Sequence, residues 1–508
     1  MVSKIISGAI HGISGFQVNV EVDVSQGLPS FDIVGLPDSS IRESRERVRT
    51  AIKNSLFNFP VKKITVNLAP ADIKKEGPYF DLPIAIAILS CIDIVPKNSV
   101  NNVFFCGELS LDGNIGPVNG VLSMVHNAYK NGIKNFVIPI DNFQEANLIS
   151  GINVLGVSNL KEVVNYFTNE PVPYTKTSIK NISFAKPKFE HDFANVKGQD
   201  IVKRAVEVAA AGGHNILIIG PPGSGKTMIA NCIPDILPPL TLEESIDVTK
   251  IYSVAGFLKD KNYLINSRPF RSPHHTISYA ALAGGGRSTK PGEISLAHNG
   301  ILFLDELPEF QRNVLEVLRQ PLEEGVINIS RANANVSYPS NVMLVASMNP
   351  CPCGYYGDAD SERCTCSPAR ISKYLNKISG PLLDRIDIHV EASGVKYSEL
   401  SENKIYESSK EIRERVLTAR EFQQKRYTSE KNNANLSVNE ISKFCAISEQ
   451  SHKLLENSFK SGYLSPRGYH KILKVARTIA DLECSENIEP MHLSEATHYR
   501  SLDKKYFN

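Results

Sequence analysis

The first 170 residues alternate short apolar segments with amphipathic ones. Polar and apolar residues alternate over 16–22 and predict a half-buried strand, whereas the apolar runs at 64–68 and 136–140 predict more fully buried strands. A capping Asp or Ser opens the segment 38–57, in which apolar residues recur at helical spacing, and a second helix is expected over 81–89. This part of the chain therefore predicts a domain that mixes strands and helices.

The rest of the chain divides into three parts by the same criterion. Residues 171–190 are polar, contain several prolines and have weak periodicity, as expected of a linker. Residues 191–395 return to buried strands that alternate with helices, the pattern of a parallel sheet covered on both faces. Over 396–508 the strand signals stop, and charged amphipathic segments such as 408–427 and 467–484 predict a helical domain.

Composition agrees with a folded protein of several domains. The 508 residues are 42% hydrophobic and 22% charged, which excludes wholesale disorder, and the length predicts about three domains. No run of about 18 apolar residues and no signal peptide is evident, so we expect a cytoplasmic chain with reduced cysteines and no membrane partner. A net charge of +2 neither favours nor excludes nucleic acid as a partner.

A glycine-rich segment directly after a buried strand predicts an ATP-binding phosphate loop. Its residues are Gly220, Pro221, Pro222, Gly223, Ser224, Gly225, Lys226 and Thr227. Small residues allow the backbone to wrap around phosphates, so that N–H groups and a helix N-terminus point at negative charge. Lys226 is expected to reach the β- and γ-phosphates and the Thr227 hydroxyl to ligate Mg²⁺. An accidental loop is the alternative, but the strand before it and the helix after it argue against one.

Two carboxylates follow the next apolar strand, residues 301–304. Asp305 is expected to hold the Mg²⁺ shell and Glu306 to polarise the attacking water as general base, because ligands of parallel sheets bind at the carboxyl ends of the strands. A third strand at 341–349 ends in Asn349. Because it accompanies the phosphate loop and the two carboxylates, Asn349 is expected to orient the water or contact the γ-phosphate. By itself, an Asn after a strand is usually a turn residue.

Four of the nine cysteines form a dense cluster: Cys351, Cys353, Cys364 and Cys366. Reduced thiols at this density predict a structural, tetrahedral Zn²⁺ site, and the polar loop between the two pairs needs such a staple to fold. One residue between the members of each pair is fewer than zinc knuckles usually have. Free thiols or a redox disulfide pair are the alternatives.

These motifs together resemble the AAA+ ATPases and, within them, the ComM/YifB family of the magnesium-chelatase-like branch. The phrases that carry the resemblance are FRSPHH at 270–275, PGEISLAH at 291–298, LFLDELPE at 302–309, MNPCPCG at 348–354, LLDRID at 382–387 and ARTIADL at 476–482. The resemblance as a whole covers almost the whole chain. The resemblance implies an α/β fold with a P-loop parallel sheet and a helical lid.

The resemblance also implies a ring of identical subunits, expected to be a hexamer. Arg385 is similar to the arginine finger that completes the nucleotide site of a neighbouring subunit. An ion pair with Asp384 or Asp387 is the simpler alternative for this residue. Arg467, at the start of a helix, is similar to the second sensor arginine of the lid, acting in cis or in trans.

Two insertions are candidates for contact with DNA. Residues 325–340 predict a hairpin with Arg331 at or near its tip, and in related helicases such a hairpin projects into the ring pore. Residues 271–290, which include His274 and His275, form a glycine-rich basic loop that can approach a phosphate backbone. The alternative is that the hairpin packs on a neighbour and that the two histidines are structural.

The N-terminal domain resembles the Lon-protease-like (S5-type, α+β) domain. The matching residues include APAD at 69–72 and GELSLDG at 107–113. Where an active protease needs a Ser and a Lys, this chain has Tyr79, Phe80 and Asn119, so proteolysis is not expected. What remains is a scaffold or a DNA-binding platform. The candidate DNA-binding residues on the first helix are Arg42, Arg45, Arg49 and Lys53. The same helix also carries Glu43 and Glu46, so an ordinary solvent-exposed face is the alternative.

The resemblance implies a ring-forming ATP hydrolase that acts as a DNA helicase. Its substrates would be single-stranded and branched DNA, and it would promote branch migration when incoming DNA recombines during natural transformation. One alternative is a chelatase subunit that drives Mg²⁺ insertion into a porphyrin. Another is a nucleotide-gated scaffold on DNA that hydrolyses ATP too slowly to translocate.

Overall fold

The computed structural model describes most of the chain. The described residues are 2–168, 175–176, 191–258, 264–286, 289–331, 334–357, 363–394, 406–427, 431–460 and 466–507, with the backbone alone for 175–176, 331, 334, 457–460, 466–467 and 503–504. Among them no helix is both long and apolar enough to cross a membrane. They form two compact units: unit 1 comprises Met1–Ser183 with Leu242–Ile265, and unit 2 comprises Phe184–Thr241 with Asn266–Asn508.

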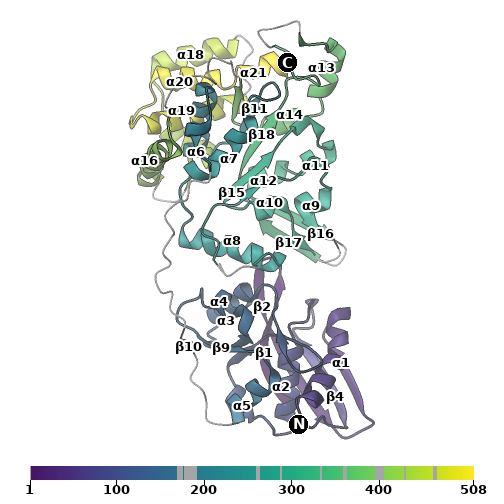
Figure 1. Cartoon of the computed structure of the whole chain (residues 1–508). Coiled ribbons are helices and arrows are strands. Elements are labelled where there is room, and N and C mark those ends of the chain that lie inside the picture. Colours follow the sequence, from purple (N-terminus) through teal and green to yellow (C-terminus); the bar gives the residue numbers. More distant parts are fainter. Residues whose placement is uncertain are drawn as a thin grey trace. The chain divides into compact units, whose positions relative to one another are not determined.

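Unit 1 is built on a mixed eight-stranded sheet with the strand order β10-β9-β8-β5-β1-β2-β4-β3 (Figure 1). Strand β2 pairs antiparallel with both β1 and β4, whereas the pairings among β1, β5, β8 and β9 are parallel. The strands are β1 (Val2–His11), β2 (Ser14–Ser25), β3 (Ser30–Val34), β4 (Lys63–Ala69), β5 (Val103–Phe105), β8 (Asn135–Pro139), β9 (Asn153–Val157) and β10 (Thr175–Lys176), with a small separate ladder of β6 (Glu108–Leu109) and β7 (Ile115–Gly116).

The helices of unit 1 are α1 (Ser39–Asn54), α2 (Asp81–Cys91), α3 (Val121–Lys130), α4 (Phe143–Ala146), α5 (Leu160–Thr168) and α8 (Leu242–Ala255). The helix expected over 38–57 is present, and its cap is Asp38, whose carboxylate accepts a hydrogen bond from the Ile41 N–H at 2.9 Å. Every residue of α2 is buried, which explains why its sequence has no polar face. Arg47 of α1 reaches the fully buried Asp81 at the start of α2, with 2.7 Å between Nε and Oδ2.

Helix α8 belongs to unit 1 although the sequence on both sides of it belongs to unit 2. It packs against α3 through buried polar contacts: the Ser253 hydroxyl accepts from the Gly120 N–H at 2.8 Å and donates to the Glu145 carboxylate. The same carboxylate accepts from the Leu122 N–H at 2.8 Å. The chain therefore leaves the nucleotide-site region after α7, enters unit 1 and returns, within the range that the sequence predicts as one ATPase core.

Unit 2 contains a five-stranded sheet in the order β12-β15-β18-β11-β19, and all its pairings are parallel (Figure 1). This confirms the parallel sheet predicted from the alternation of buried strands and helices. Its strands are β11 (Ile216–Ile219), β12 (Phe270–Arg271), β15 (Gly300–Leu304), β18 (Val342–Met348) and β19 (Ile388–Glu391). The two short ladders are β13 (Gly284–Gly285) with β14 (Lys290–Pro291), and β16 (Val326–Arg331) with β17 (Ala334–Pro339).

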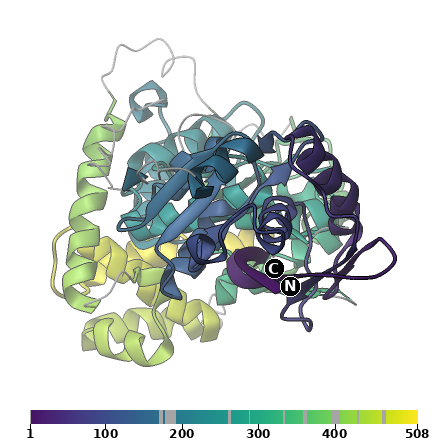
Figure 2. The ribbon, with the colours of Figure 1, turned by 90° about the horizontal axis from the view of Figure 1, so that it is seen from below.

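The C-terminal helices gather beside this sheet, in light green to yellow in Figure 2. Helix α16 packs on α6 and α7, and α19 packs on α6 and α16, so sheet and C-terminal helices share one apolar core that includes Ile216, Val416 and Ile479. The helices of unit 2 are α6 (Asp200–Gly212), α7 (Lys226–Ile236), α9 (Tyr279–Ala283), α10 (Glu293–Leu296), α11 (Arg312–Glu316), α12 (Arg319–Glu324), α13 (Pro368–Leu375), α14 (Gly380–Leu383), α16 (Ser409–Tyr427), α17 (Val438–Phe444), α18 (Glu449–Lys460), α19 (Pro466–Leu482), α20 (Pro490–His498) and α21 (Leu502–Tyr506).

Candidate functional site

The predicted phosphate loop joins the carboxyl end of β11 to the start of α7. Gly223 and Gly225 have φ angles of 78° and 83°, in the left-handed region that favours glycine, and a Cβ on either would meet no atom within 4 Å. Glycine is therefore needed here for the backbone turn rather than for lack of space. The loop leaves its outer face open, as a loop that wraps phosphates requires.

Lys226 is folded back onto this loop. Its Nζ donates to the carbonyl oxygens of Gly220 and Pro221, each at 2.8 Å, and to Asn349 Oδ1 at 3.2 Å. Burial lowers the pKa of Lys226, and the nearby carboxylates of Asp305 and Glu306 act in the opposite direction. The ammonium group is thus held by neutral oxygens that a phosphate can replace.

Thr227 and Asp305, the residues predicted to share a Mg²⁺ ion, are in direct contact. The Thr227 hydroxyl donates to Asp305 Oδ2 at 2.9 Å, and the Ser347 hydroxyl of β18 donates to the other carboxylate oxygen. A hydroxyl and a carboxylate side by side next to a phosphate loop are the hard oxygen ligands that Mg²⁺ prefers. The donor set therefore fits this ion.

Glu306 lies at a sharp turn after β15, with a left-handed φ of 54°. Its carboxylate is half exposed, and Oε2 lies 3.4 Å from His275 Nδ1. His275 in turn stacks on His274, with 4.1 Å between ring centroids. The structure thus places His275 against the predicted general base, a contact that its position in a candidate DNA loop does not reveal. His274 is exposed and contacts Thr276, with 2.9 Å between Nδ1 and Oγ1.

Arg385 does not pair with either neighbouring aspartate that the sequence offered as an alternative. Its Nη2 lies 2.6 Å from the Glu323 carboxylate of α12, and its Nε and Nη1 donate to the carbonyl oxygens of Arg319 at 3.1 Å and Pro381 at 2.6 Å. Only 8% of its side chain is exposed. An arginine finger in trans would first have to exchange Glu323 for phosphate oxygens.

For two further predicted residues the structure describes the backbone but not the side chain. Strands β16 and β17 form the predicted hairpin, and the pair Arg331–Ala334 closes it, but the Arg331 side chain lies outside the described residues, as does Ala332. Arg467 is the second residue of α19, and its side chain lies outside them too. Their roles stay predictions.

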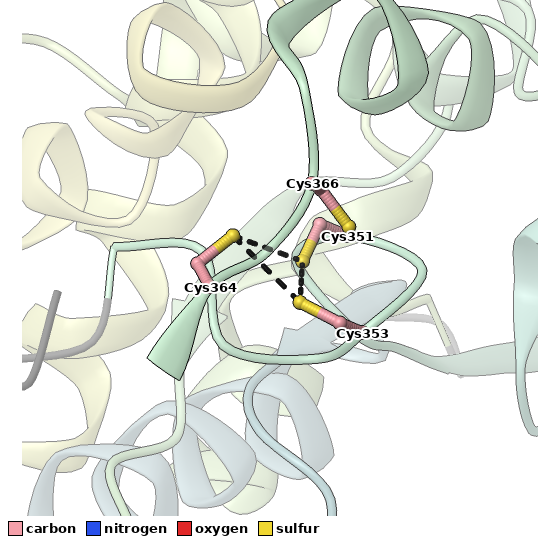
Figure 3. A group of neighbouring side chains, drawn as sticks. All are labelled: Cys351, Cys353, Cys364 and Cys366. Atoms are coloured by element: carbon pink, nitrogen blue, oxygen red, sulfur yellow. Dashed lines mark hydrogen bonds between the residues drawn. The ribbon is translucent and has the colours of Figure 1, made fainter. Parts of the chain in front are cut away.

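The four predicted zinc ligands come together in space (Figure 3). Cys351 and Cys353 stand on the turn after β18, and Cys364 and Cys366 on the segment that leads into α13, with all four sulfur atoms within 4.8 Å of one another. The Sγ–Sγ distances are 3.2 Å for Cys351–Cys353, 3.8 Å for Cys351–Cys364 and 3.7 Å for Cys353–Cys364. Four thiolates about 2.3 Å from a tetrahedral Zn²⁺ are about 3.8 Å apart, so the geometry fits this ion.

The local environment favours a thiolate at Cys353. Burial raises the pKa of its thiol, but hydrogen bonds from the Tyr355 backbone, Cys351 and Cys366 outweigh burial and lower the pKa to about 6. A hydrogen bond from the Cys366 backbone lowers the pKa of Cys364, but burial and the hydrogen bonds with Cys353 and Cys351 raise it to about 11. The cysteine turn also abuts the phosphate loop, because a Cβ on Gly354 would collide with the ring of Pro222. A metal here would stiffen the chain next to the nucleotide site.

The positions at which a Lon-type protease carries its dyad hold unreactive groups. Tyr79 packs edge-on against Phe80, with 6.2 Å between ring centroids, and burial, together with Glu76 and Asp38, raises the pKa of Tyr79 to about 12. The phenol therefore stays protonated near neutral pH. Asn119 lies beside Gly256 in the same unit.

On α1, one of the four basic residues predicted to contact DNA already contacts other side chains of the chain. Arg49 lies over the Phe59 ring, 5.5 Å from its centroid, and 4.0 Å from the Glu46 carboxylate. Arg42, Arg45 and Lys53 are exposed.

Comparison with known proteins supports the same assignment. Three family models match the chain: "Magnesium chelatase, subunit ChlI" over residues 192–400, "Subunit ChlI of Mg-chelatase" over 20–142 and "Magnesium chelatase, subunit ChlI C-terminal" over 406–500. YifB of Escherichia coli K12 is 43% identical over 494 residues, which are 97% of this chain and 96% of that protein. Competence protein ComM of Haemophilus influenzae is 43% identical over 503 residues, 98% of this chain and 97% of that protein.

A partial likeness to Lon protease 2 of Bacillus subtilis, 29% identical over 170 residues, covers 30% of each chain. The fold and the site define a magnesium-chelatase-like AAA+ protein with a Lon-like N-terminal part. With relatives of 43% identity along nearly its whole length, this chain belongs to the ComM/YifB family.

The cysteine cluster predicts one tightly bound zinc ion for each chain. Cys364→Ser removes one of four ligands and should lower the zinc content of the purified protein to a small fraction, measured by inductively coupled plasma mass spectrometry. Cys484→Ser removes an exposed cysteine outside the cluster and should leave the zinc content unchanged. Purified protein without zinc but with four free thiols would contradict the assignment.

The contact between His275 and Glu306 predicts that His275 affects hydrolysis. His275→Ala should lower kcat for ATP by about tenfold, because the general base loses the partner that orients it. His274→Ala is the matched control and should change kcat little. If His275→Ala instead weakens DNA binding and leaves DNA-free turnover intact, the histidine serves DNA contact, as its sequence position suggests.

Proposed function

We propose that this chain is an ATP-hydrolysing ring motor that moves DNA, a helicase that promotes branch migration during recombination of incoming DNA. The observation that carries the proposal is the meeting of Lys226, Thr227 and Asp305 at one edge of the parallel sheet. Glu306 adds a candidate general base at the same edge. The proposed place of action is the cytoplasm, and the proposed substrates are single-stranded and branched DNA.

Binding of ATP requires Lys226 to exchange two loop carbonyls for phosphate oxygens. Thr227 and Asp305 would hold Mg²⁺, which when bound neutralises charge on the phosphates. Glu306 would take a proton from the attacking water while His275 holds its carboxylate in place. Asn349, which contacts the lysine Nζ, would keep Lys226 directed towards the γ-phosphate.

Arg385 would act on the ATP of a neighbouring subunit. Its guanidinium stabilises the charge of the transition state only if the neighbour's phosphates replace the Glu323 carboxylate. This exchange makes hydrolysis depend on the subunit interface. A closed ring follows for a protein in which each site needs the next subunit, and we propose a hexamer by resemblance to the AAA+ ATPases.

The DNA part of the proposal draws on the hairpin and on the relatives. Strands β16 and β17 end at the pair Arg331–Ala334, and the relative from Haemophilus influenzae is named a competence protein. In a ring, hairpins of this kind would contact one strand and advance it as subunits hydrolyse ATP in turn.

A chelatase ATPase subunit is a second candidate, because all three family models carry a chelatase subunit in their descriptions. The description of the N-terminal match names the same subunit, so the N-terminal domain does not set the two candidates apart. The cysteine cluster fits both candidates, because a structural metal beside the phosphate loop takes part in the chemistry of neither DNA nor a porphyrin. A slow, nucleotide-gated scaffold on DNA shares the site and differs only in its turnover.

The proposal predicts ATP-dependent unwinding of a forked DNA by the purified full chain. Lys226→Ala should abolish unwinding because ATP is no longer held, and Glu306→Gln should abolish it while ATP still binds. Strand separation is followed with a fluorophore and quencher on the two strands.

An exposed lysine away from the site provides the control for this assay. Lys431→Met removes a surface ion pair with Glu440, at 2.8 Å, and should leave unwinding unchanged. Unwinding that survives Glu306→Gln would refute the assigned chemistry, and DNA binding without unwinding by the unmodified chain would favour the scaffold.

A further inference from the structure

A buried charge pair lies next to Arg385 and has no part in the nucleotide site itself. Asp387 Oδ1 lies 2.9 Å from Lys471 Nζ, and Asp387 Oδ2 lies 3.2 Å from His214 Nδ1. Only 12% of the aspartate side chain, 14% of the lysine and none of the histidine is exposed. The aspartate is two residues along the chain from the candidate arginine finger.

The three partners come from three different elements of unit 2. His214 lies two residues before β11, the strand that leads into the phosphate loop. Lys471 belongs to the lid helix α19, and Asp387 directly precedes β19. The Lys471 ammonium also donates to the Ile386 carbonyl at 3.2 Å, and Arg500 donates to the same carbonyl at 2.7 Å. The backbone around Asp387 is therefore fastened to the C-terminal helices.

The same stretch is fastened to the sheet through Asn215. Its side-chain amide donates to the Arg385 carbonyl at 2.9 Å, and its side-chain oxygen accepts from the Leu344 N–H of β18 at 2.8 Å. The N–H groups of Asp387 and Ile388 donate to the Asn215 carbonyl at 3.0 and 3.1 Å. Residues 385–388 thus bridge the sheet and α19.

His214 extends this link to a second point of α19. Burial lowers the pKa of His214, against the effect of Asp387, so the imidazole is neutral near pH 7. A neutral ring has one donor and one acceptor nitrogen. With Nδ1–H donating to Asp387, Nε2 lies 2.8 Å from Thr478 Oγ1, whose hydroxyl also lies within reach of the Lys474 carbonyl, at 3.0 Å. Burial disfavours the ionised form of Asp387, but the nearby Lys471 ammonium and the hydrogen bond from His214 keep its pKa well below the usual range.

We infer that Asp387 is a positioning residue that couples the lid helix α19 to Arg385, so that the lid's position on its own nucleotide sets the finger presented to the next subunit. Helix α19 begins at Pro466 and carries Arg467, the predicted second sensor arginine, four residues before Lys471. The coupling would link the two sites of neighbouring subunits where Arg467 acts in cis. The inference rests on the proposed role of Arg385 in trans.

Stability alone is a weak reason for this arrangement. A buried ion pair loses solvation, and apolar residues of similar size often stabilise a core as well or better. The pair does supply directed contacts that fix two elements in one relative position. A coupling role explains why those contacts converge on the residues next to Arg385.

The first arm of the test measures ATP turnover by the assembled full chain. Asp387→Asn keeps the volume of the side chain and removes its charge, and it should lower kcat by about tenfold with KM changed by less than about twofold. A misplaced finger weakens transition-state stabilisation and leaves ATP binding in cis intact. Lys431→Met is the matched control and should change neither value.

The second arm mixes subunits to separate effects in cis from effects in trans. Lys226→Ala subunits cannot use ATP but still present Arg385, so mixing them with Arg385→Ala subunits should restore turnover. They should also restore turnover to Asp387→Asn subunits, whose own sites are intact. Subunits with both Lys226→Ala and Asp387→Asn should restore Arg385→Ala much less.

The outcomes distinguish the coupling role of Asp387 from the proposed action of Arg385 in trans. If Lys226→Ala subunits fail to restore Arg385→Ala, Arg385 does not act in trans and the proposed function is wrong at this point. If they restore Arg385→Ala but not Asp387→Asn, or if the double variant restores as well as the single one, the coupling role of Asp387 is refuted.

Lys471→Met provides an independent variant of the same link, because it keeps most of the side chain's length and removes its charge. It should behave as Asp387→Asn does in both arms, with thermal melting and size-exclusion chromatography confirming a folded, assembled protein. If neither variant folds, the pair serves the stability of unit 2, and the inference is contradicted.

Discussion

The function of this protein depends on the parallel pairing of β15, β18 and β11, which brings three strand ends to one edge of the sheet. Side chains that are far apart in the sequence meet there: Lys226 after β11, Asp305 after β15 and Asn349 after β18. Parallel strands place their carboxyl ends together, so the pairing itself assembles the site. The buried apolar runs of these strands therefore determine the position of the charged groups.

Three of the charged groups assigned to ATP are held by partners within the chain. Lys226 is held by loop carbonyls, Asp305 by hydroxyls and Arg385 by Glu323. Nucleotide binding then replaces existing hydrogen bonds of these groups with hydrogen bonds to the phosphates. The binding free energy is therefore the difference between the two sets of contacts. In the proposed role of Arg385 this exchange needs a neighbouring subunit, which would link hydrolysis to assembly.

Local pattern was sufficient for the elements and the motif residues, but not for contacts between distant segments. The amphipathic spacing of α1, the apolar run of β11 and the β16–β17 hairpin follow from period and turn residues alone. The membership of α8 in unit 1 does not, since its docking on α3 depends on Ser253 and Glu145, 108 residues apart. For the same reason the contact of His275 with Glu306 and that of Arg385 with Glu323 were missed, because neither partner is marked by spacing.

The central claim is that this nucleotide site drives work on DNA, and the rate of ATP hydrolysis by the purified full chain tests it most directly. The rate is measured alone, with single-stranded DNA and with a porphyrin plus Mg²⁺. We expect DNA to raise the rate several-fold and the porphyrin to leave it unchanged. Stimulation by the porphyrin and not by DNA would contradict the account and favour the chelatase.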